Sequence, residues 1–299
     1  MFRRYTQPAR AVFLLACAAL PLAPAAPAAQ QQQQQPAGAQ TPAKTAPAKA
    51  EPAKKEPQPP KKGAEPTAEQ VAETVILVHG FRERLAQVRK SGVERGRISR
   101  ATDDGRTEEI TYERSFKRGD TSEKDKIRLD QKRPSVEYSL VYNEGRVFGL
   151  LRGTPFTPRQ DDVTVFLADA QHGIDTLLRY KENGATLAYV GKEKQKNIDM
   201  WLLDLTDKEQ RRTRYYISAQ SGRVLWLEYE AAPPGTTAPV RYKRTFHDYR
   251  TIQGTRMPYR TVLYADGKQV EESQILTVVY GVKMEDTVFQ NPEAAISTQ

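Results

Sequence analysis

The chain has 299 residues, a net charge of +9, three histidines and a single cysteine, Cys17. One cysteine excludes an intrachain disulfide framework and a metal site built from several thiolates. The positive charge does not indicate nucleic-acid binding, because residues 1–66 hold nine of the 46 basic but only three of the 37 acidic side chains. Residues 67–299 are therefore close to neutral, with both signs interspersed as on a solvated surface.

Residues 1–29 have the composition of a secretory signal peptide. Three arginines stand within the first ten residues, an apolar run covers residues 11–20, and Ala26-Pro27-Ala28 offers small residues for cleavage. Ten helical residues rise only about 15 Å, which is half of a hydrocarbon core of roughly 30 Å. We therefore expect cleavage near Ala28 and export to the periplasm.

Cys17 leaves an alternative processing route open. The tetrapeptide Leu14-Leu15-Ala16-Cys17 resembles a bacterial lipobox, in which the cysteine is lipidated and becomes the new N-terminus. Against this route, only six apolar residues precede Cys17, and the apolar run continues past it. Lipidation at Cys17 would anchor the exported protein to a membrane.

Residues 30–66 form a linker of glutamines followed by Pro-Ala-Lys units. The linker has almost no large apolar residue to bury, so it cannot offset the entropy of folding. Its proline content favours an extended, semi-rigid spacer. We expect a passive tether; the alternative is a basic segment that adheres to the membrane surface or the cell wall.

The folded domain is predicted to cover residues 67–299 and to begin with helices. Thr67-Ala68-Glu69-Gln70 has the pattern of a capping box. Apolar residues follow at helical spacing in two runs separated by Gly80: Val71, Val75 and Val78, then Phe81, Leu85 and Val88. Two short helices with a glycine corner are therefore expected within Thr67–Lys90.

Strands dominate the rest of the domain. The segment Phe246–Lys268 is the clearest, because aromatic and β-branched runs alternate there with a glycine turn and an Asp-Gly turn. Charged residues alternate with apolar ones in the earlier strands, which predicts one wet and one dry face. The strands are expected at 93–101, 108–117, 126–131, 136–143, 147–152, 185–193, 198–206, 214–218, 224–230, 241–249, 257–265 and 270–282.

A second helical region is predicted from Asp161 to Tyr180. Apolar residues recur there in steps of three and four and form one continuous stripe. Gly173 should bend or split the helix, and Asn183-Gly184 should end the region. The predicted fold class is α+β: a curved antiparallel sheet, an incomplete and half-open β-barrel, covered on its concave side by these helices.

No catalytic or metal-binding pattern stands out. Thr74–Phe81 resembles the His-Gly turn of α/β-hydrolases, but the chain lacks their Gly-x-Ser-x-Gly elbow, so a helix is the preferred interpretation. His79, His172 and His247 share no ligand spacing, and no glycine-rich phosphate loop is present. We therefore expect no enzyme activity, no metal and no cofactor.

An apolar and aromatic surplus in the strands is the remaining functional signal. These side chains are either plain core or the lining of an apolar ligand cavity. The candidates for a cavity lining are Tyr138, Tyr142, Phe148, Phe166, Leu167, Trp201, Leu203, Tyr216, Trp226 and Tyr229.

Three stretches carry a family resemblance: VILVHGFRERLAQVRK at 75–90 with the strand after it, YKENGATLAYVGKE at 180–193, and Phe246–Lys268. These stretches, and their order along the chain, resemble those of the outer-membrane lipoprotein-sorting proteins, the LolA/LolB-like group of the bacterial periplasm. The resemblance implies a half-open barrel with a helix-covered apolar cavity for acyl chains, and a carrier role without catalysis. The Pro-Ala-Lys linker has no counterpart in the dedicated carrier.

The leading hypothesis is a monomeric periplasmic carrier or sensor that shelters a lipid or lipoprotein acyl chain beneath Thr67–Lys90 and Asp161–Tyr180. The alternative is a structural or interaction module of the cell envelope with a filled barrel and no ligand cavity. An enzyme is the third class, and nucleic acid is not an expected partner.

Overall fold

The computed structural model describes residues 65–102, 104–233 and 235–291. All of them lie within one compact unit of the chain, Gln58–Gln299. The expected signal peptide, Cys17 and nearly all of the linker lie outside the described residues.

Two helices open the fold, as the sequence predicts. Helix α1 (Ala68–His79) begins with the expected capping box, in which Thr67 Oγ1 accepts from the Gln70 backbone N–H and Gln70 Oε1 accepts from that of Thr67. Gly80 ends α1 with φ 134°, and α2 (Arg82–Val88) follows. Phe81, expected on the buried side of α2, instead precedes it with φ 64° and is 55% exposed.

Thirteen strands form one antiparallel sheet in the order β6-β5-β4-β3-β2-β1-β13-β12-β11-β10-β9-β8-β7. Strands that follow one another in the chain pair with each other, except β6 and β7, and β1 also pairs with β13, which joins the two ends of the folded domain. The strands are β1 Ser91–Ala101, β2 Thr107–Lys117, β3 Lys126–Lys132, β4 Glu137–Asn143, β5 Arg146–Leu151, β6 Thr154–Phe156, β7 Thr186–Gln195, β8 Ile198–Thr206, β9 Arg212–Ser218, β10 Val224–Ala231, β11 Val240–Ile252, β12 Thr255–Ala265 and β13 Lys268–Tyr280.

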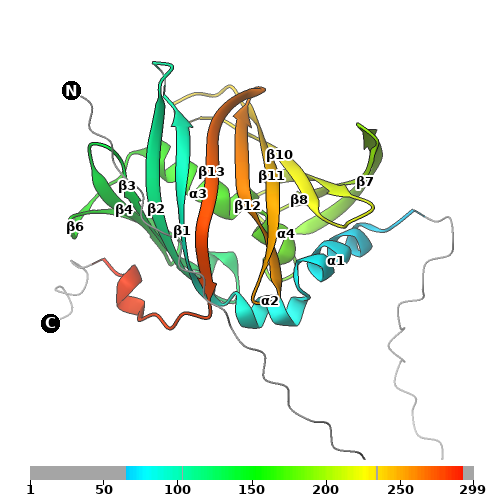
Figure 1. Ribbon diagram of the computed structural model, residues 1–299, viewed down its shortest axis with the longest axis horizontal. Helices are drawn as coiled ribbons and strands as arrows, with labels where there is room; N and C mark the ends of the chain where they lie inside the picture. Colours follow the sequence, from blue (N-terminus) through cyan, green and yellow to red (C-terminus); the bar gives the residue numbers. More distant parts are fainter. Residues whose placement is uncertain (1–64, 103, 234, 292–299) are drawn as a thin grey trace, which may run out of the picture. The chain divides into compact units, whose positions relative to one another are not determined.

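The route of the chain places two more helices over the sheet. Strands β6 and β7 follow one another in the chain but lie at opposite edges of the sheet. The segment between them, with α3 (Gln160–His172) and α4 (Ile174–Leu178), must therefore cross from one edge to the other. In Figure 1 α3 and α4 pass behind β1, β12 and β13. The predicted half-open barrel covered on its concave side by helices is confirmed, including the break at Gly173.

Local irregularities help the sheet to curve, because a bulge bends a strand and increases its twist. The register shifts leave single extra residues in β7, β10 and β13, namely Val190, Leu225, Val270 and Leu276. The shift at Leu276 falls beside Gly96 of β1, where a Cβ atom would lie 2.5 Å from the Gln274 carbonyl oxygen and 2.6 Å from the Tyr112 ring. Glycine at this position therefore lets the Tyr112 ring lie over β1 on the concave face.

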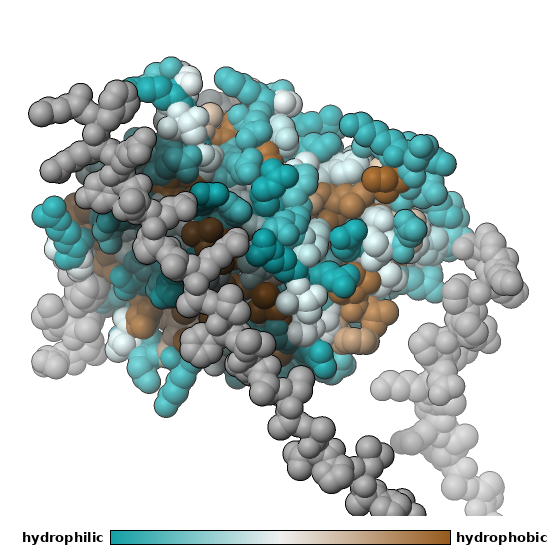
Figure 2. Space-filling model, in the orientation of Figure 1, coloured by the Kyte–Doolittle hydropathy of each residue, from teal (hydrophilic) through white to brown (hydrophobic). Residues whose placement is uncertain are grey.

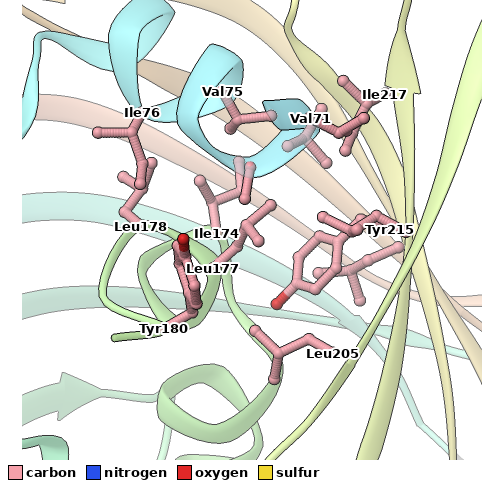
Figure 3. Packing of buried hydrophobic residues seen from close by; sticks show 14 of the residues in the cluster. Val71, Val75, Ile76, Ile174, Leu177, Leu178, Tyr180, Leu205, Tyr215 and Ile217 are labelled. Carbon is pink, nitrogen blue, oxygen red and sulfur yellow. The ribbon is translucent and has the colours of Figure 1, made fainter. Parts of the chain in front are cut away.

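One end of the concave face is filled by a hydrophobic core. Val75 and Ile76 of α1 pack with Leu177 and Leu178 of α4, and all four are at most 4% exposed (Figure 3). Tyr215 of β9 lies under both helices, and its hydroxyl donates to the Gly173 carbonyl oxygen at 2.9 Å. The junction between α3 and α4 is therefore held against the sheet at this end.

The convex face carries separate, smaller clusters. Val141 and Leu150 pack with Phe289 of the 3-10 helix η2 (Asp286–Phe289). Neither η2, the 3-10 helix η1 (Ser122–Lys124) nor the short strand β6 is predicted from the sequence. On the face shown in Figure 2, hydrophobic residues form separate patches among hydrophilic ones.

A candidate ligand cavity under the helices

Two adjoining cavities occupy the part of the concave face that the core leaves unfilled. The α3 cavity, of about 380 Å³, lies between α3 and the concave side of β1–β4 and β11–β13. The α4 cavity, of about 480 Å³, lies between α4, the end of α3, the loop 119–125 and the sheet. Arg114, Ala170 and Arg244 line both cavities. Each volume falls in the range typical of small-molecule sites, about 300–1,000 Å³.

The α3 cavity has a mixed lining, in which apolar side chains are accompanied by nine charged ones. Ile98, Leu129 and Leu140 contribute apolar side chains from the sheet, and Phe166 contributes one from α3. The charged residues include Arg133, which approaches Asp162 of α3 at 3.7 Å. A flexible alkyl chain fits the apolar part of such a lining, because its methylene groups need apolar contact and no hydrogen bonds.

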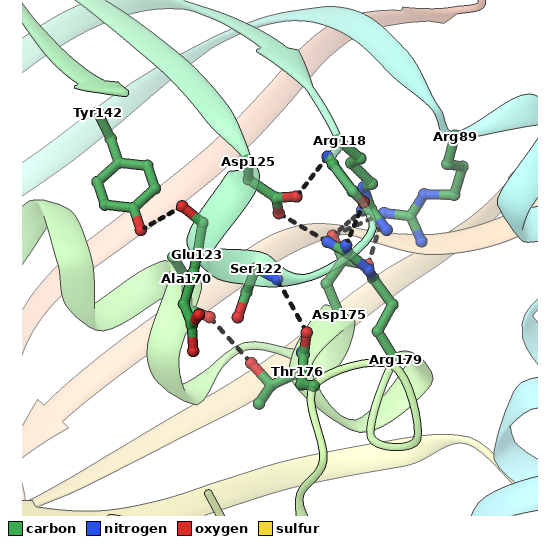
Figure 4. A network of polar contacts seen from close by, with 12 residues as sticks. Arg89, Arg118, Ser122, Glu123, Asp125, Tyr142, Ala170, Asp175, Thr176 and Arg179 are labelled. Carbon is green, nitrogen blue, oxygen red and sulfur yellow. Dashed lines mark hydrogen bonds and ion pairs between the residues drawn. The ribbon is translucent and has the colours of Figure 1, made fainter. Parts of the chain in front are cut away.

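Charged residues, ten basic and seven acidic, make up 17 of the 40 that line the α4 cavity. Figure 4 shows part of the polar network that they form. Asp175 of α4 forms ion pairs with Arg89, at 3.0 Å, and with Arg118. Arg179 pairs with Asp125 at 2.6 Å and also donates to the Gly119 carbonyl oxygen at 2.9 Å. These contacts join α4 to α2, to the end of β2 and to the loop before β3.

The electrostatic balance at Asp175 favours its charged form. Burial alone would raise the pKa of this carboxyl, but the charges of Arg118 and Arg89 outweigh burial and hold its pKa well below the usual range. Burial lowers the pKa of the Arg118 guanidinium to about 10, and repulsion from Arg89 and Arg179 acts in the same direction. Asp175 and Arg118 are therefore both ionised at neutral pH.

Two buried histidines lie beside the cavities in their neutral forms. His79 Nδ1 lies 2.8 Å from the Val75 carbonyl oxygen and donates to it, which leaves Nε2 as an acceptor without a partner among the described residues. His172 stacks on Tyr229 at 3.9 Å, and its Nδ1 lies 2.7 Å from Thr213 Oγ1. Burial lowers the pKa of each histidine to about 4. His172 therefore has a side-chain hydrogen-bond partner, whereas His79 Nε2 has none among the described residues.

Replacing Asp175 by asparagine is expected to destabilise the protein by about 1–3 kcal/mol. Removing one partner of a buried ion pair costs about 3–5 kcal/mol, and the 36% exposure of the Asp175 side chain reduces that cost through solvent screening. Arg89 and Arg118, which are 8% and 14% exposed, would lose their shared carboxylate. Urea unfolding at neutral pH measures the change.

Asp286→Asn provides the matched control, because Asp286 also bridges two cations, Lys117 and Lys126, but is 48% exposed. We expect a loss of about 0–1 kcal/mol for this exposed pair. Equal losses of unfolding free energy in Asp175→Asn and Asp286→Asn would show that burial does not make the Asp175 ion pairs more stabilising than exposed ones.

The structure places five of the ten candidate residues beside the cavities. Tyr138, Phe166 and Tyr229 line the α3 cavity, whereas Tyr142 and Leu167 line the α4 cavity.

Of the remaining five candidates, four lie away from the two cavities and one belongs to the hydrophobic core. Phe148 packs with the η2 cluster, and Tyr216 stacks on Trp226 at 4.5 Å in a second cluster on the convex face. Trp201 lies at the edge of the core, beside a groove along α1. Leu203 is fully buried beneath α1 and α4. The register of β4–β5 and β8–β10 decides these positions, because adjacent residues of a strand face opposite sides.

The dry concave face expected from the sequence is corrected by the structure. Arg114 of β2 and Arg118, directly after it, line the α4 cavity together with Tyr112 and Phe116. The sequence does contain the signal, since residues two apart in a strand share a face. Residue type alone places charged residues on the wet face, whereas their position in the strand places Arg114 on the concave face.

Metal and membrane signals are weak in the described residues. Within residues 65–102, 104–233 and 235–291, no three His, Cys, Asp or Glu side chains group in a way suited to a metal ion. None of the helices in the same ranges combines the length and hydrophobicity of a membrane-spanning helix.

Solved structures share this fold. A DUF1329 family protein from Desulfovibrio piger is 12% identical and superposes with a TM-score of 0.55, covering 76% of this chain and 98% of that one. A LolA superfamily protein from Nitrosomonas europaea is 11% identical, with a TM-score of 0.53 and the same coverage. No protein-family model matches the chain, and no curated protein matches its sequence. At these identities the likeness shows the fold alone, and the LolA-like resemblance seen in the sequence is confirmed at that level.

Proposed function

We propose that the chain is a non-catalytic binding protein of the bacterial envelope that holds an apolar chain, such as a lipid or lipoprotein acyl chain, under α3. The observation that supports this proposal most strongly is the α3 cavity of about 380 Å³ with the apolar side chains in its lining. The LolA-like fold agrees with it, and the signal-like N-terminus favours a periplasmic location. Within such a role the protein would act as a carrier or sensor in lipoprotein sorting or lipid transport.

The energetics of the cavity allow useful affinity without a dedicated hydrogen bond to the chain. Burying one methylene group is worth about 0.8 kcal/mol, so ten buried carbons give about 8 kcal/mol before ordering costs. A net free energy of about 8 kcal/mol corresponds to a Kd of about 1 μM, so a chain must bury more than ten carbons to reach that affinity once ordering costs are subtracted. The filled core under α1 and the hollow under α3 lie side by side, which favours ligand binding over the alternative of a purely structural module.

The test is uptake of a fluorescent fatty acid by the purified, delipidated full-length protein. We expect saturable binding of one molecule per chain with a Kd in the micromolar range. Absence of saturable binding to this probe, together with absence of any co-purifying lipid in native mass spectra, would overturn the proposed function.

A further inference from the structure

The position of Arg114 is the starting observation for a second proposal. Arg114 lies in the middle of β2 and lines both cavities. In the described part of the chain no hydrogen bond or ion pair reaches its guanidinium group, whose contact is the ring of Phe116 at 5.9 Å. A guanidinium group carries five N–H donors in a planar fork that matches carboxylate and phosphate oxygens. Arg114 is thus a cation with unused donors at the junction of the cavities.

The carboxylates nearest to Arg114 are engaged by other groups. Glu94 stands directly opposite Arg114 on β1, but its Oε1 accepts the Tyr112 hydroxyl at 2.8 Å. Asp169 pairs with Arg244 at 2.5 Å, and Asp175 is shared by Arg89 and Arg118. These acids raise the pKa of Arg114 from a distance, although burial opposes them, so the guanidinium group stays charged.

Other arginines around Arg114 also have spare capacity for an anion. Arg118, directly after β2, lies over the same Phe116 ring at 5.6 Å, so two guanidinium groups contact that ring. Arg89 is 7% exposed, lines the α4 cavity, and its Nε has no partner among the described residues. Basic residues outnumber acidic ones in the lining of this cavity, ten to seven. An unpaired donor or an uncompensated cation in a buried site costs free energy, and an anionic ligand would relieve that cost.

From this geometry we infer that the two cavities form one site for a single-chain amphiphile with an anionic headgroup, a carboxylate or a phosphate. The headgroup binds at Arg114 and Arg118 with Arg89 nearby, and the alkyl chain extends along Leu129, Leu140 and Phe166 under α3. This inference rests on the proposed function and names the class of ligand. It adds a polar anchor to a site that would otherwise select only for an apolar chain.

The test compares ligands that share a chain but differ in headgroup charge. The full-length, delipidated protein is titrated with cis-parinaric acid and with its uncharged methyl ester. Hydrogen bonds to charged groups are worth about 1.5–3 kcal/mol, so we expect the acid to bind about tenfold or more tightly than the ester. Displacement by lysophosphatidic acid, with lysophosphatidylcholine for comparison, distinguishes a phosphate from a carboxylate headgroup.

Arg114→Gln is expected to reduce the acid-to-ester preference to less than about threefold. Arg95→Gln is the matched control, because Arg95 lies on the adjacent strand with its side chain 63% exposed, and it should keep the full preference. Arg114→Lys keeps the charge and should retain part of the preference, which separates loss of charge from loss of folding. Thermal unfolding of each variant checks that it folds.

Three results would overturn the inference. Equal binding of acid and ester, or an unchanged preference in Arg114→Gln, would remove the anion site but leave the proposed acyl-chain function in place. Failure of both ligands to bind would remove the proposed function and the inference together.

Discussion

Replacing Ala170 by tryptophan is expected to weaken fatty-acid binding by about a hundredfold. Ala170 lies on α3, is half-buried and lines both cavities, so an indole ring at this position would occupy space at their junction. Excluding about four methylene groups from burial costs about 3 kcal/mol, which corresponds to about a hundredfold in Kd. Titration with the fluorescent fatty acid measures the effect.

Leu276→Trp is the control for the Ala170 variant. Leu276 is 54% exposed on β13 and lines neither cavity. We expect binding to be unchanged by the control. If Ala170→Trp binds fatty acid as tightly as the unmodified protein while remaining folded, the ligand does not lie under α3.

Lowering the pH from 7.5 to 5 is expected to reduce the free energy of unfolding by about 4 kcal/mol through His79 and His172. Each has a folded pKa of about 4, below the value of about 6.5 in an unfolded chain. The unfolded state therefore binds more protons, and stability is lost as the pH falls from about 6.5 towards 4. Linkage gives about 2 kcal/mol for each histidine at pH 5. Urea unfolding at the two pH values measures the difference.

Charged neighbours affect the pKa values of the two histidines in both directions, but burial remains the largest cause of the lowering. Arg89 and Arg256 lower the pKa of His79 whereas Asp175 raises it, and Arg244 and Arg211 lower that of His172. Carboxylates with a lowered pKa, such as Asp175, lose their contribution only below about pH 4, outside the measured range.

His172→Gln should retain a hydrogen-bonding group near Thr213 and remove about half of the pH-dependent loss. His247→Gln is the comparison, because His247 is half-buried and its pKa is lowered less strongly by burial. A loss between pH 7.5 and 5 that stays the same in His172→Gln would contradict the assignment to the buried ring.

Much of the fold is predictable from local sequence patterns. The capping box at Thr67, the break at Gly173 and the turns of Phe246–Lys268 all appear where the sequence places them. Period-two and period-3.6 patterns act over a few residues, so they identify the elements and most of their ends. The antiparallel order follows as well, since neighbouring strands along the chain usually pair.

Long-range strand pairing, and the face of the sheet to which a side chain points, are harder to predict from the sequence. The pairing of β1 with β13 joins residues almost 190 positions apart, for which no local pattern exists. A shift by one residue also moves a side chain to the other face. Tyr216 was selected as a cavity candidate, but it is Tyr215 that packs beneath the helices while Tyr216 lies on the convex side. Bulges such as the one between Val224 and Trp226 make this facing harder to infer.

The charged interior changes the nature of the predicted ligand site. An acyl-chain site built from apolar side chains alone would not distinguish ligands by their headgroups. Here Arg114 and Arg118 line the α4 cavity together with Tyr112 and Phe116, so apolar and cationic groups lie in one hollow. A mixed lining of this kind is typical of sites in which a few polar groups orient an otherwise apolar ligand.

Photo-crosslinking with a fatty acid that carries a diazirine on its chain tests most directly whether an alkyl chain lies under α3. After irradiation of the full-length protein, peptide mapping by mass spectrometry should locate the adducts on α3 and on the facing strands, at Phe166, Leu129 and Leu140. Excess unlabelled fatty acid should suppress them. Adducts confined to exposed convex residues such as Leu276 and Val279 would contradict a ligand site beneath the helix.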